Sequence, residues 1–353
     1  MTDMRAMVTG GAGFIGSALV DALLADGIPT ATVDALTYAG SMSNLAGAMD
    51  CAHHLFAEAD VRDQQAVDAV FEAHRPNIVF HLAAETHVDR SIDTPLQALE
   101  TNIEGTYAML AAASAYWSGL DEPARAAFRF VQVSTDEVFG SAAAGAFFRE
   151  TSRYNANSPY AASKVSADYL VRTWSLSFGL PVLVAHGCNT YGPRQFPEKL
   201  VPLMILNGAE GKDLPIYGSG TQVRDWMHVS DHVRGLRAVA SRGVPGASYL
   251  LSARNPLMNI EVVEHLCAAL DDARPDGSPH AELISHVDDR PGHDLRYAGD
   301  PSKAENDLGW RADVDFEEGL ADTVGWYLAN GDWCAQVQEH YQRERLGLAR
   351  AAQ

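Results

Sequence analysis

The stretch VTGGAGFIGS, residues 8–17, constrains the fold more than any other part of the chain. It follows a short apolar run and leads into FIGSALVDALLADG, where apolar residues recur at helical spacing until Gly27. Gly10, Gly13 and Gly16 stand three residues apart. A glycine loop between a strand and a helix lets the backbone turn tightly and brings the amide groups of the helix start close to a phosphate. The pattern predicts a strand, a phosphate-binding turn and a helix.

Short apolar runs alternate with helical patterns through the first half of the chain. The runs that predict strands are MRAMVT at 4–9, PTATVDAL at 29–36, NIVFHLAA at 77–84, FRFVQVST at 128–135 and LPVLVAHG at 180–187. Between them lie helical patterns at 63–74 and 94–117. Strands that alternate with helices predict βαβ units and an α/β fold with a Rossmann-like, doubly wound parallel sheet. The ligands of such a sheet bind outside the carboxyl ends of its strands.

The sequence changes character after about residue 190, where prolines divide it into short elements. They are Pro193, Pro197, Pro202, Pro215, Pro245 and Pro256. We therefore expect a smaller, irregular α/β lobe packed against the sheet. The expected division gives residues 1–185 to a dinucleotide-binding domain, with return segments near 225–252. Residues 186–224 and 253–353 then form a substrate-binding lobe.

Composition limits the compartment and the partners. The chain has 353 residues, 47% of them hydrophobic, and its apolar stretches are shorter than the ~20 residues of a membrane span. Its first residues carry an acid and lack an apolar core, so no signal peptide is expected and the predicted location is the cytoplasm. A net charge of −20 argues against nucleic acid or an anionic membrane as a partner. Any phosphorylated ligand must be held by local cations.

Cysteine and histidine spacing indicates neither a disulfide framework nor a metal site. The four cysteines, Cys51, Cys188, Cys267 and Cys334, lie far apart without a Cys-x-x-Cys pair. The 13 histidines include no His-Glu-x-x-His. We expect buried or inert thiols and no metal.

An acid at the end of the second predicted strand bears on the choice of dinucleotide. Asp34 lies eighteen residues beyond the last glycine of the loop, where an acid accepts hydrogen bonds from an adenosine ribose. The alternative role is helix or turn capping. No cation occurs between Arg5 and Arg62, so a 2′-phosphate would find none close in sequence, and NAD is favoured over NADP. Asp60 and Val61, at another strand end, are predicted neighbours of the adenine or parts of a turn.

Tyr160 and Lys164 form a candidate catalytic pair. They stand four residues apart in the helical segment PYAASKVSADYL, so both side chains lie on one face of the helix. A nearby ammonium favours phenolate, and we expect it to lower the pKa of Tyr160 towards neutrality. The pair then supplies a base that accepts a proton from a sugar hydroxyl.

A second pair, Asp136 and Glu137, lies in VSTDEVFG at the exit of the fourth predicted strand. Adjacent carboxylates at the end of a buried strand are costly unless they are used. A solvated turn is the alternative explanation.

These motifs together resemble a known family. The glycine pattern with Tyr160-x-x-x-Lys164 resembles the extended short-chain dehydrogenase/reductase superfamily. Within it, the chain resembles the nucleoside-diphosphate-glucose 4,6-dehydratases, most closely the branch that acts on dTDP-glucose, from about residue 4 to 330. The segments that carry this resemblance are VDALTYAG, HLAAETHVDRSI, TNIEGT, VSTDEVFG, SPYAASK, FPEKLVPLMI, VRDWMHVSDH and DRPGHDLRY.

The resemblance implies a chemical role for each member of the two pairs. Tyr160 accepts the O4 proton while NAD takes the C4 hydride, and Thr135 hydrogen-bonds O4. Asp136 then protonates the departing C6 hydroxyl and Glu137 removes the C5 proton, after which the hydride returns to C6. Asp136 must be protonated at neutral pH, and burial beside the Glu137 carboxylate can raise its pKa. The net reaction converts dTDP-glucose to its 4-keto-6-deoxy form and water.

The resemblance also implies two binding sets and an assembly. The cofactor set is Gly10, Gly13, Phe14, Ile15, Gly16, Asp34, Leu36, Thr37, Asp60, Val61, Tyr160 and Lys164. The nucleotide-sugar set is Thr86, Asn189, Lys199, Leu200, Pro215, Tyr217, Arg224, Asn259, Arg290 and His293. The long apolar helices at 94–117 and 160–178 imply a homodimer through a four-helix bundle.

The sequence departs from the family pattern at two places. Thr190 stands where the family has a second asparagine before Tyr-Gly-Pro, a variant similar to that of UDP-glucuronate decarboxylases. YLLSARNPLMN, at 249–259, lacks the usual Tyr-Asn-Ile-Gly-Gly start. A UDP-sugar 4,6-dehydratase or a UDP-glucuronate decarboxylase is therefore the alternative enzyme. A non-catalytic NAD-sensing regulator is the alternative of another class, although it need not keep both catalytic pairs.

Overall fold

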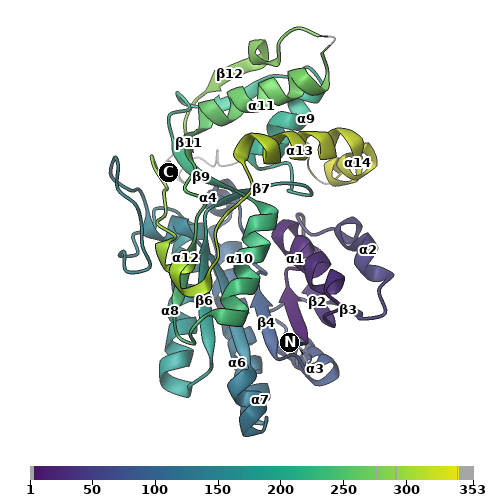
Figure 1. The fold of residues 1–353 in the computed structure, drawn as a ribbon, viewed down its shortest axis with the longest axis vertical. Coiled ribbons are helices and arrows are strands. Elements are labelled where there is room, and N and C mark those ends of the chain that lie inside the picture. Colours follow the sequence, from purple (N-terminus) through teal and green to yellow (C-terminus); the bar gives the residue numbers. More distant parts are fainter. Residues whose placement is uncertain (1–3, 276, 291, 340, 342–353) are drawn as a thin grey trace.

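The computed structural model describes residues 4–339 and 341, except 276 and 291. A large lobe is built round a seven-stranded sheet, and a smaller lobe lies above it in Figure 1. The chain builds the large lobe first, leaves it after β6 and returns to it through α10 and β10. Residues 342–353, which we assigned to the second lobe, lie outside the described part of the chain.

All seven strands of the large sheet are parallel, in the order β10-β6-β5-β4-β1-β2-β3. Their bounds are β1 Ala6–Thr9, β2 Thr30–Asp34, β3 His54–Glu58, β4 Ile78–His81, β5 Arg129–Thr135, β6 Val182–Gly187 and β10 Ser248–Leu251. The strand order reverses between β1 and β4, and such a switch point opens a crevice for ligands. The predicted Rossmann-like fold class is confirmed.

Helices cover both faces of this sheet (Figure 1). On one face lie α1 Phe14–Ala25, α10 Val229–Arg242 and α12 Ser302–Leu308. On the other lie α3 Gln64–His74, α6 Gly105–Ser118 and α8 Pro159–Phe178. Leu19 on the first face and Met109 on the second are both fully buried. Two covered faces explain why most of these strands appear in the sequence as continuous apolar runs.

Strand β3 shows no apolar run in the sequence, and only its end was expected, beside Asp60 and Val61. It lies at the edge of the sheet and, within the described part of the chain, pairs only with β2. Its five residues HLFAE are half-buried or exposed. Leu55 in its middle is 38% exposed. Because an edge strand buries little, its sequence shows no apolar run.

The long helix predicted at 94–117 is divided in three. It consists of α5 Pro95–Leu99, a π-helical turn Glu100–Glu104 and α6. The π turn contains Asn102, whose side chain accepts a hydrogen bond from the Glu85 amide and donates one to Ser163 of α8. A π turn inside a helix often marks a functional region, and this one ties α8 to a loop at the carboxyl end of β4.

The smaller lobe is more regular than its prolines predicted. Its strands are β7 Asn189–Tyr191, β8 Leu214–Tyr217, β9 Val223–His228, β11 Pro256–Met258 and β12 Ile284–Val287, and its helices are α9 Leu200–Ala209, α11 Asn259–Ala273, α13 Phe316–Ala329 and α14 Gly331–Glu339. Pro202 lies in the first turn of α9, where no intrahelical donor is lost. Pro256 begins β11, whose one partner strand among the described residues is β9.

Short elements complete the described chain. They are η1 Met42–Leu45, α2 Ala46–Met49, α4 Val88–Asp93, α7 Glu122–Ala127, η3 Asp136–Phe139 and η4 His280–Leu283. Among the described residues, every helix is too short or too polar to cross a membrane.

Candidate active site

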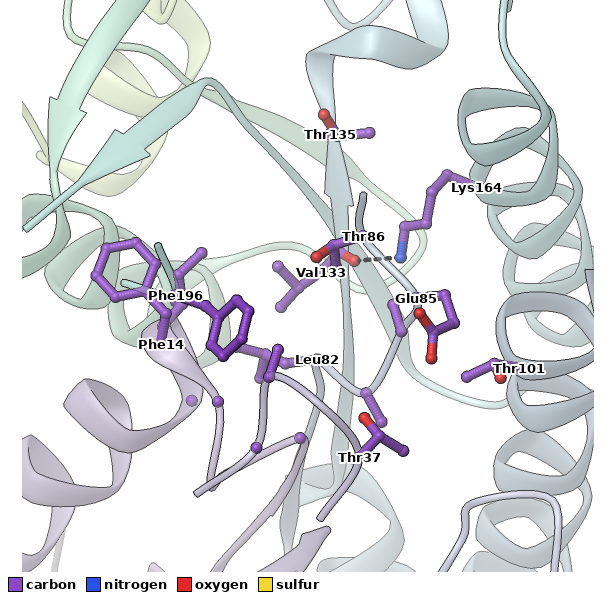
Figure 2. A pocket seen from close by; sticks show the side chains of 18 of the residues that line it. Phe14, Thr37, Leu82, Glu85, Thr86, Thr101, Val133, Thr135, Lys164 and Phe196 are labelled. Atoms are coloured by element: carbon purple, nitrogen blue, oxygen red, sulfur yellow. Dashed lines mark hydrogen bonds between the residues drawn. The ribbon is translucent and has the colours of Figure 1, made fainter. Parts of the chain in front are cut away.

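A cavity lies outside the carboxyl ends of the strands, where the two lobes meet. Its walls are the glycine loop, the ends of β2, β4, β5 and β6, the start of α8, and Gln195, Phe196, Glu198 and Lys199 of the smaller lobe. Figure 2 shows Lys164 and Glu85 on one side of it and the rings of Phe14 and Phe196 on the other. The cavity therefore reaches from the glycine loop to both candidate catalytic pairs.

The glycine loop leaves room for a ligand at the start of α1. Gly10 has φ +69°, and a Cβ there would lie 2.8 Å from the Ala83 amide nitrogen. A Cβ on Gly16 would collide with the Gly10 carbonyl oxygen. In the described chain no side chain caps α1, whose N-cap is Gly13, so the amide groups of its first turn remain open to a phosphate. The loop fits the pyrophosphate of a dinucleotide.

Asp34 ends β2 and lines the cavity. One carboxylate oxygen accepts the Ala12 amide at 2.8 Å and the other accepts the Leu36 amide at 2.8 Å. The turn-capping alternative is thus present in the structure, and the same two bonds fix the orientation of the carboxylate. Burial raises the pKa of Asp34, against the effect of these two amides. Leu36 has φ +48°, and its backbone amide is the group that contacts Asp34. Among the described residues it is not part of the cavity wall.

Arg62 is a cation in the cavity wall, although its distance from Asp34 in the sequence did not indicate this. It lines the wall next to Asp60 and Val61, and its guanidinium pairs with Asp60 at 2.7 Å and with Glu100 at 3.2 Å. Its charge is therefore already balanced by two carboxylates. The position of Arg62 does not by itself create a site for a 2′-phosphate.

The catalytic candidates come together at the end of β5 and the start of α8. Thr135 is the last residue of β5, and its side chain hydrogen-bonds that of Tyr160. The Lys164 ammonium donates to the Val133 carbonyl oxygen at 2.8 Å, as the dashed line in Figure 2 shows. Ser158 caps α8 through the Ala161 amide, which fixes the start of the helix beside the strand. All four of the residues Thr135, Asp136, Tyr160 and Lys164 line the cavity.

The expected low pKa of Tyr160 is wrong, because the surroundings of its phenol act in the opposite direction. Burial raises the pKa of this phenol well above its usual value, and the Glu137 carboxylate raises it further. The Lys164 ammonium, itself lowered in pKa by burial, is bonded to a backbone carbonyl. Burial and nearby carboxylates outweigh the effect that we assigned to the lysine.

Asp136 and Glu137 are neighbours with different surroundings. Burial first, and the Glu137 carboxylate second, raise the pKa of Asp136 well above its usual value, which confirms the expected direction and causes. Burial also raises the pKa of Glu137, but Lys199, Arg290 and Arg224 act to lower it. In the described chain Asp136 Oδ2 has no hydrogen-bond partner. This arrangement favours a protonated Asp136 beside a more readily ionised Glu137.

Three of the ten nucleotide-sugar residues that we predicted line the cavity: Thr86, Asn189 and Lys199. Lys199 is the N-cap of α9, just before Leu200, and its ammonium donates to the Thr86 carbonyl oxygen at 2.8 Å. Asn189 begins β7. These residues join the wall of the cavity to the smaller lobe.

The other predicted residues belong to the smaller lobe. Arg290 pairs with Asp89 at 2.7 Å, and the Tyr217 hydroxyl donates to the same carboxylate at 3.1 Å. Arg224 is buried in β9, and its guanidinium carbon lies 4.1 Å from the Tyr297 ring centroid. Three positions complete the set: Pro215 in β8, Asn259 at the start of α11, and His293, whose ring nitrogen is 2.6 Å from Asp289.

Sequence reasoning missed two acids, Glu198 and Asp89, that form ion pairs with arginines near the cavity. Glu198 lines the cavity, and its buried carboxylate contacts Arg90 at 3.1 Å and Tyr38 at 3.1 Å. Asp89 holds Arg290 and Tyr217. The available signal was the presence of both acids inside motif segments, HLAAETHVDRSI and FPEKLVPLMI. A buried acid in such a segment indicates a partner cation.

Comparisons with known proteins show which family this chain belongs to. A family model described as GDP-mannose 4,6 dehydratase matches residues 7–323. A protein of Sinorhizobium fredii (strain NBRC 101917 / NGR234), named probable dTDP-glucose 4,6-dehydratase, is 46% identical over 350 residues, 99% of this chain and 100% of that protein. A dTDP-glucose 4,6-dehydratase of Escherichia coli is 47% identical over 360 residues, with 98% and 99% covered. The crystal structure of DesIV, a dTDP-glucose 4,6-dehydratase from Streptomyces venezuelae with NAD and a second molecule bound, has a TM-score of 0.85 and 40% identity, covering 95% of this chain and 100% of that chain.

Proposed function

This chain belongs to the GDP-mannose 4,6 dehydratase family, and we propose that it acts there as an NAD-dependent dTDP-glucose 4,6-dehydratase, a carbon–oxygen lyase. The relatives that bear this name match nearly the whole chain. The observation that carries the proposal is the pair Asp136 and Glu137, with unequal surroundings, in the same cavity region as Tyr160. An enzyme that only oxidises or epimerises a hydroxyl has no need of this acid and base.

NAD is the proposed cofactor, and it supplies a hydride acceptor that later returns the hydride to the same sugar. The open amides at the start of α1 would hold its pyrophosphate. Asp34 would accept hydrogen bonds from the adenosine ribose, since each of its oxygens keeps acceptor capacity beyond its one amide bond. Asp60 and Val61 would lie beside the adenine.

Tyr160 and Thr135 act on the C4 hydroxyl of the sugar in this proposal. The Tyr160 phenolate accepts the O4 proton, and Thr135 donates a hydrogen bond to the oxygen. Burial and the Glu137 carboxylate raise the pKa of this phenol, so nearby positive charge is needed to favour the phenolate that this step requires. Lys164, fixed to the Val133 carbonyl oxygen, keeps its ammonium beside this reaction centre.

Asp136 and Glu137 then remove water across C5 and C6. Asp136 donates its proton to the departing C6 hydroxyl, a role that requires the raised pKa. Glu137 accepts the C5 proton, which the C4 ketone has made acidic, and the three surrounding cations favour its ionised form beforehand. Protons and charge balance because one carboxyl gives a proton and its neighbour takes one.

The substrate assignment can be tested directly with purified protein. It is incubated separately with dTDP-glucose, UDP-glucose and UDP-glucuronate, and the products are identified by mass spectrometry. The proposal expects loss of one water from dTDP-glucose as the fastest reaction. Faster water loss from UDP-glucose would instead assign a UDP-sugar dehydratase. Carbon dioxide loss from UDP-glucuronate would assign a decarboxylase.

We also propose that the enzyme is a homodimer that pairs α6 and α8 of one copy with those of another. Large apolar side chains on these helices are exposed in the single chain: Leu176 is 86% exposed, Phe178 58% and Tyr107 52%. A second copy presents the same apolar surface, so the contact is self-complementary about a two-fold axis. A monomer in sedimentation velocity at micromolar concentration would contradict the dimer.

A cytoplasmic location completes the proposal. Nucleotide sugars and NAD are intracellular metabolites, so an enzyme that uses both works where they are made. Cell fractionation with an antibody against the protein tests this location.

A further inference from the structure

Asn44 is a buried polar residue behind the glycine loop, and sequence reasoning gave it no role. It lies in η1, three residues after Ser41, which caps this short helix by accepting the Ser43 amide. Only 3% of Asn44 is exposed, and among the described residues it is not part of the cavity wall. Any effect of Asn44 on a ligand must therefore pass through the groups that it contacts.

The side-chain nitrogen of Asn44 binds the glycine loop. It donates to the Ala12 carbonyl oxygen at 2.8 Å, and the Ser41 amide donates to the same oxygen at 3.0 Å. On its other side, the Ala12 amide donates to the Asp34 carboxylate at 2.8 Å. The backbone of Ala12 is thus fixed at both its donor and its acceptor, directly before Gly13 of the cavity wall.

These bonds determine the direction of the first amides of α1. The peptide group between Ala12 and Gly13 is planar, so a fixed carbonyl oxygen fixes the orientation of the whole group. Gly13 is the N-cap of α1, and the turn that follows it, from Phe14, lines the cavity with its amides uncapped by any described side chain. A rotated Ala12 peptide would turn these amides away from a phosphate, which they must face to bind it.

The smaller lobe contacts Asn44 from the opposite direction. Asn44 Oδ1 accepts from the indole nitrogen of Trp333, in α14, at 2.7 Å. In Figure 1, α14 lies on the side of the smaller lobe nearest to α1 and α2. The Asn44 carbonyl oxygen accepts from the Arg194 guanidinium at 2.7 Å, and this guanidinium also pairs with Asp21 of α1 at 2.5 Å. Two separate segments of the smaller lobe therefore fix Asn44 and α1.

We propose that Asn44 is a positioning residue for NAD, which connects Trp333 of the smaller lobe to the glycine loop and so orients the loop for the pyrophosphate. This inference rests on the proposed function, because it requires NAD in the cavity. A carboxamide suits both contacts, since its nitrogen donates to a carbonyl oxygen and its oxygen accepts from an indole. The lobe proposed to bind the sugar nucleotide thereby also maintains the shape of the cofactor loop.

The test measures the affinity of the full-length protein, freed of cofactor, for NAD, ADP and adenosine. Calorimetry gives the affinity for NAD, and displacement of fluorescent NADH gives the other two. ADP carries a pyrophosphate, whereas adenosine has only the base and the ribose. Asn44→Leu is similar in volume and uncharged but makes neither bond. It should weaken NAD and ADP about tenfold, as the loss of a hydrogen bond predicts, and leave adenosine almost unchanged.

Two tryptophans of the smaller lobe give a matched pair of variants for the same measurement. Trp333→Phe keeps an aromatic ring but removes the indole N–H that binds Asn44. It should weaken NAD and ADP about threefold, since one bond of Asn44 remains. Trp326→Phe is the control, because Trp326 packs against Trp333 with ring centroids 5.1 Å apart and is not the donor to Asn44. It removes the same volume from the same cluster and should leave NAD affinity unchanged.

Three results would overturn the inference while the proposed function stands. The first is unchanged NAD affinity in Asn44→Leu or, where that variant does not fold, in Trp333→Phe. The second is equal weakening of ADP and adenosine, which would show a merely structural role. The third is a Trp333→Phe variant that binds NAD no differently from Trp326→Phe, which would remove the smaller lobe from the connection. Failure of the unaltered protein to bind NAD would overturn both the inference and the proposed function.

Discussion

The two ends of the cavity differ in the groups that form them: mainly backbone groups at one end and charged side chains at the other. At the end proposed for the cofactor, the backbone provides the site: glycines that leave space, open amides at the start of α1, and a carboxylate fixed by two amides. At the end proposed for the nucleotide sugar, charged side chains provide it, and each already has a partner. Arg290 pairs with Asp89, and Lys199 donates to the Thr86 carbonyl oxygen. The first end is preformed, whereas the second must exchange protein partners for substrate oxygens.

This difference determines how substitutions should act. A preformed backbone site has no alternative arrangement, so the loss of one group reduces binding of one ligand sharply. A site made of paired charges can redistribute its contacts, so its substitutions act more weakly and mainly on the substrate. Between the two ends lies the reaction centre, where a lost group removes a chemical step rather than affinity. The predictions below start with that centre.

Tyr160→Phe should have the largest effect. The variant keeps the ring but cannot accept the O4 proton, so turnover of dTDP-glucose should fall about a thousandfold, in the usual range for a lost general base. Steady-state kinetics with product detection by mass measures the loss. Tyr154→Phe is the matched control, because burial also raises the pKa of Tyr154, which is partly buried and is not part of the cavity wall. Near-normal turnover in Tyr160→Phe would remove Tyr160 from the mechanism.

Asp34→Ala should weaken NAD roughly ten- to a hundredfold, because the proposed ribose contact is a charge-assisted hydrogen bond. The substitution also releases the Ala12 amide of the glycine loop. Calorimetry with NAD measures the affinity. Asp63→Ala controls for the loss of a capping carboxylate, since Asp63 caps α3 and is not part of the cavity wall. Unchanged affinity for NAD in Asp34→Ala would show that the carboxylate only caps its turn.

Asp89→Asn should affect the other end of the cavity, and less strongly. It weakens the hold on Arg290 and Tyr217, so KM for dTDP-glucose should rise by about tenfold while NAD affinity stays the same. Asp231→Asn is the control, because it breaks a buried aspartate–arginine pair, with Arg234, away from the cavity wall. If Asp89→Asn weakened NAD as much as the sugar, the two ends would not be separate.

The pH dependence of stability should give the smallest effect. The folded pKa of Asp136 is raised, so its contribution to stability is fully present below its unfolded pKa of about 3.9 and is lost as pH rises through the folded value. Asp136→Asn imitates the protonated form at every pH. The melting temperature of the unaltered protein should therefore fall relative to that of the variant as pH increases. Each kcal/mol corresponds to roughly 2–4 °C in Tm, and a difference that stays constant from pH 5 to 9 would contradict the raised pKa.

The sequence predicted the parts of the molecule that depend on local pattern. The strand–glycine loop–helix unit, the end of β2 at Asp34 and the helical segment of Tyr160 and Lys164 follow from apolar spacing and from the glycines of the loop. For edge strand β3 only the end beside Asp60 and Val61 was expected, because HLFAE buries little and shows no apolar run. The π turn at Glu100–Glu104 was not predicted, because the helical spacing of the sequence continues on both sides of it.

The sequence could not show how charged residues that lie far apart in the chain act together on one pKa or form a contact. The pKa of Tyr160 was assigned from a lysine four residues away, but burial and the carboxylates of Glu137 and Asp136 determine it. The pKa of Asp136 was predicted in the right direction because its main neighbour is the next residue. Asp89 and Arg290 are two hundred and one residues apart in the chain, so no local pattern indicates their contact.

Transfer of isotope within one sugar tests the central claim, that Asp136 and Glu137 act as acid and base while the hydride leaves C4 and returns to C6. Substrate deuterated at C4 should give 4-keto-6-deoxy product with deuterium at C6, with no reduced cofactor added. In heavy water, Glu137 exchanges its proton, so unlabelled substrate should gain solvent deuterium at C5. The Asp136→Asn, Glu137→Gln variant should release no dehydrated product. Product that carries solvent hydrogen at C6, or water loss without both carboxylates, would contradict the account even with every motif intact.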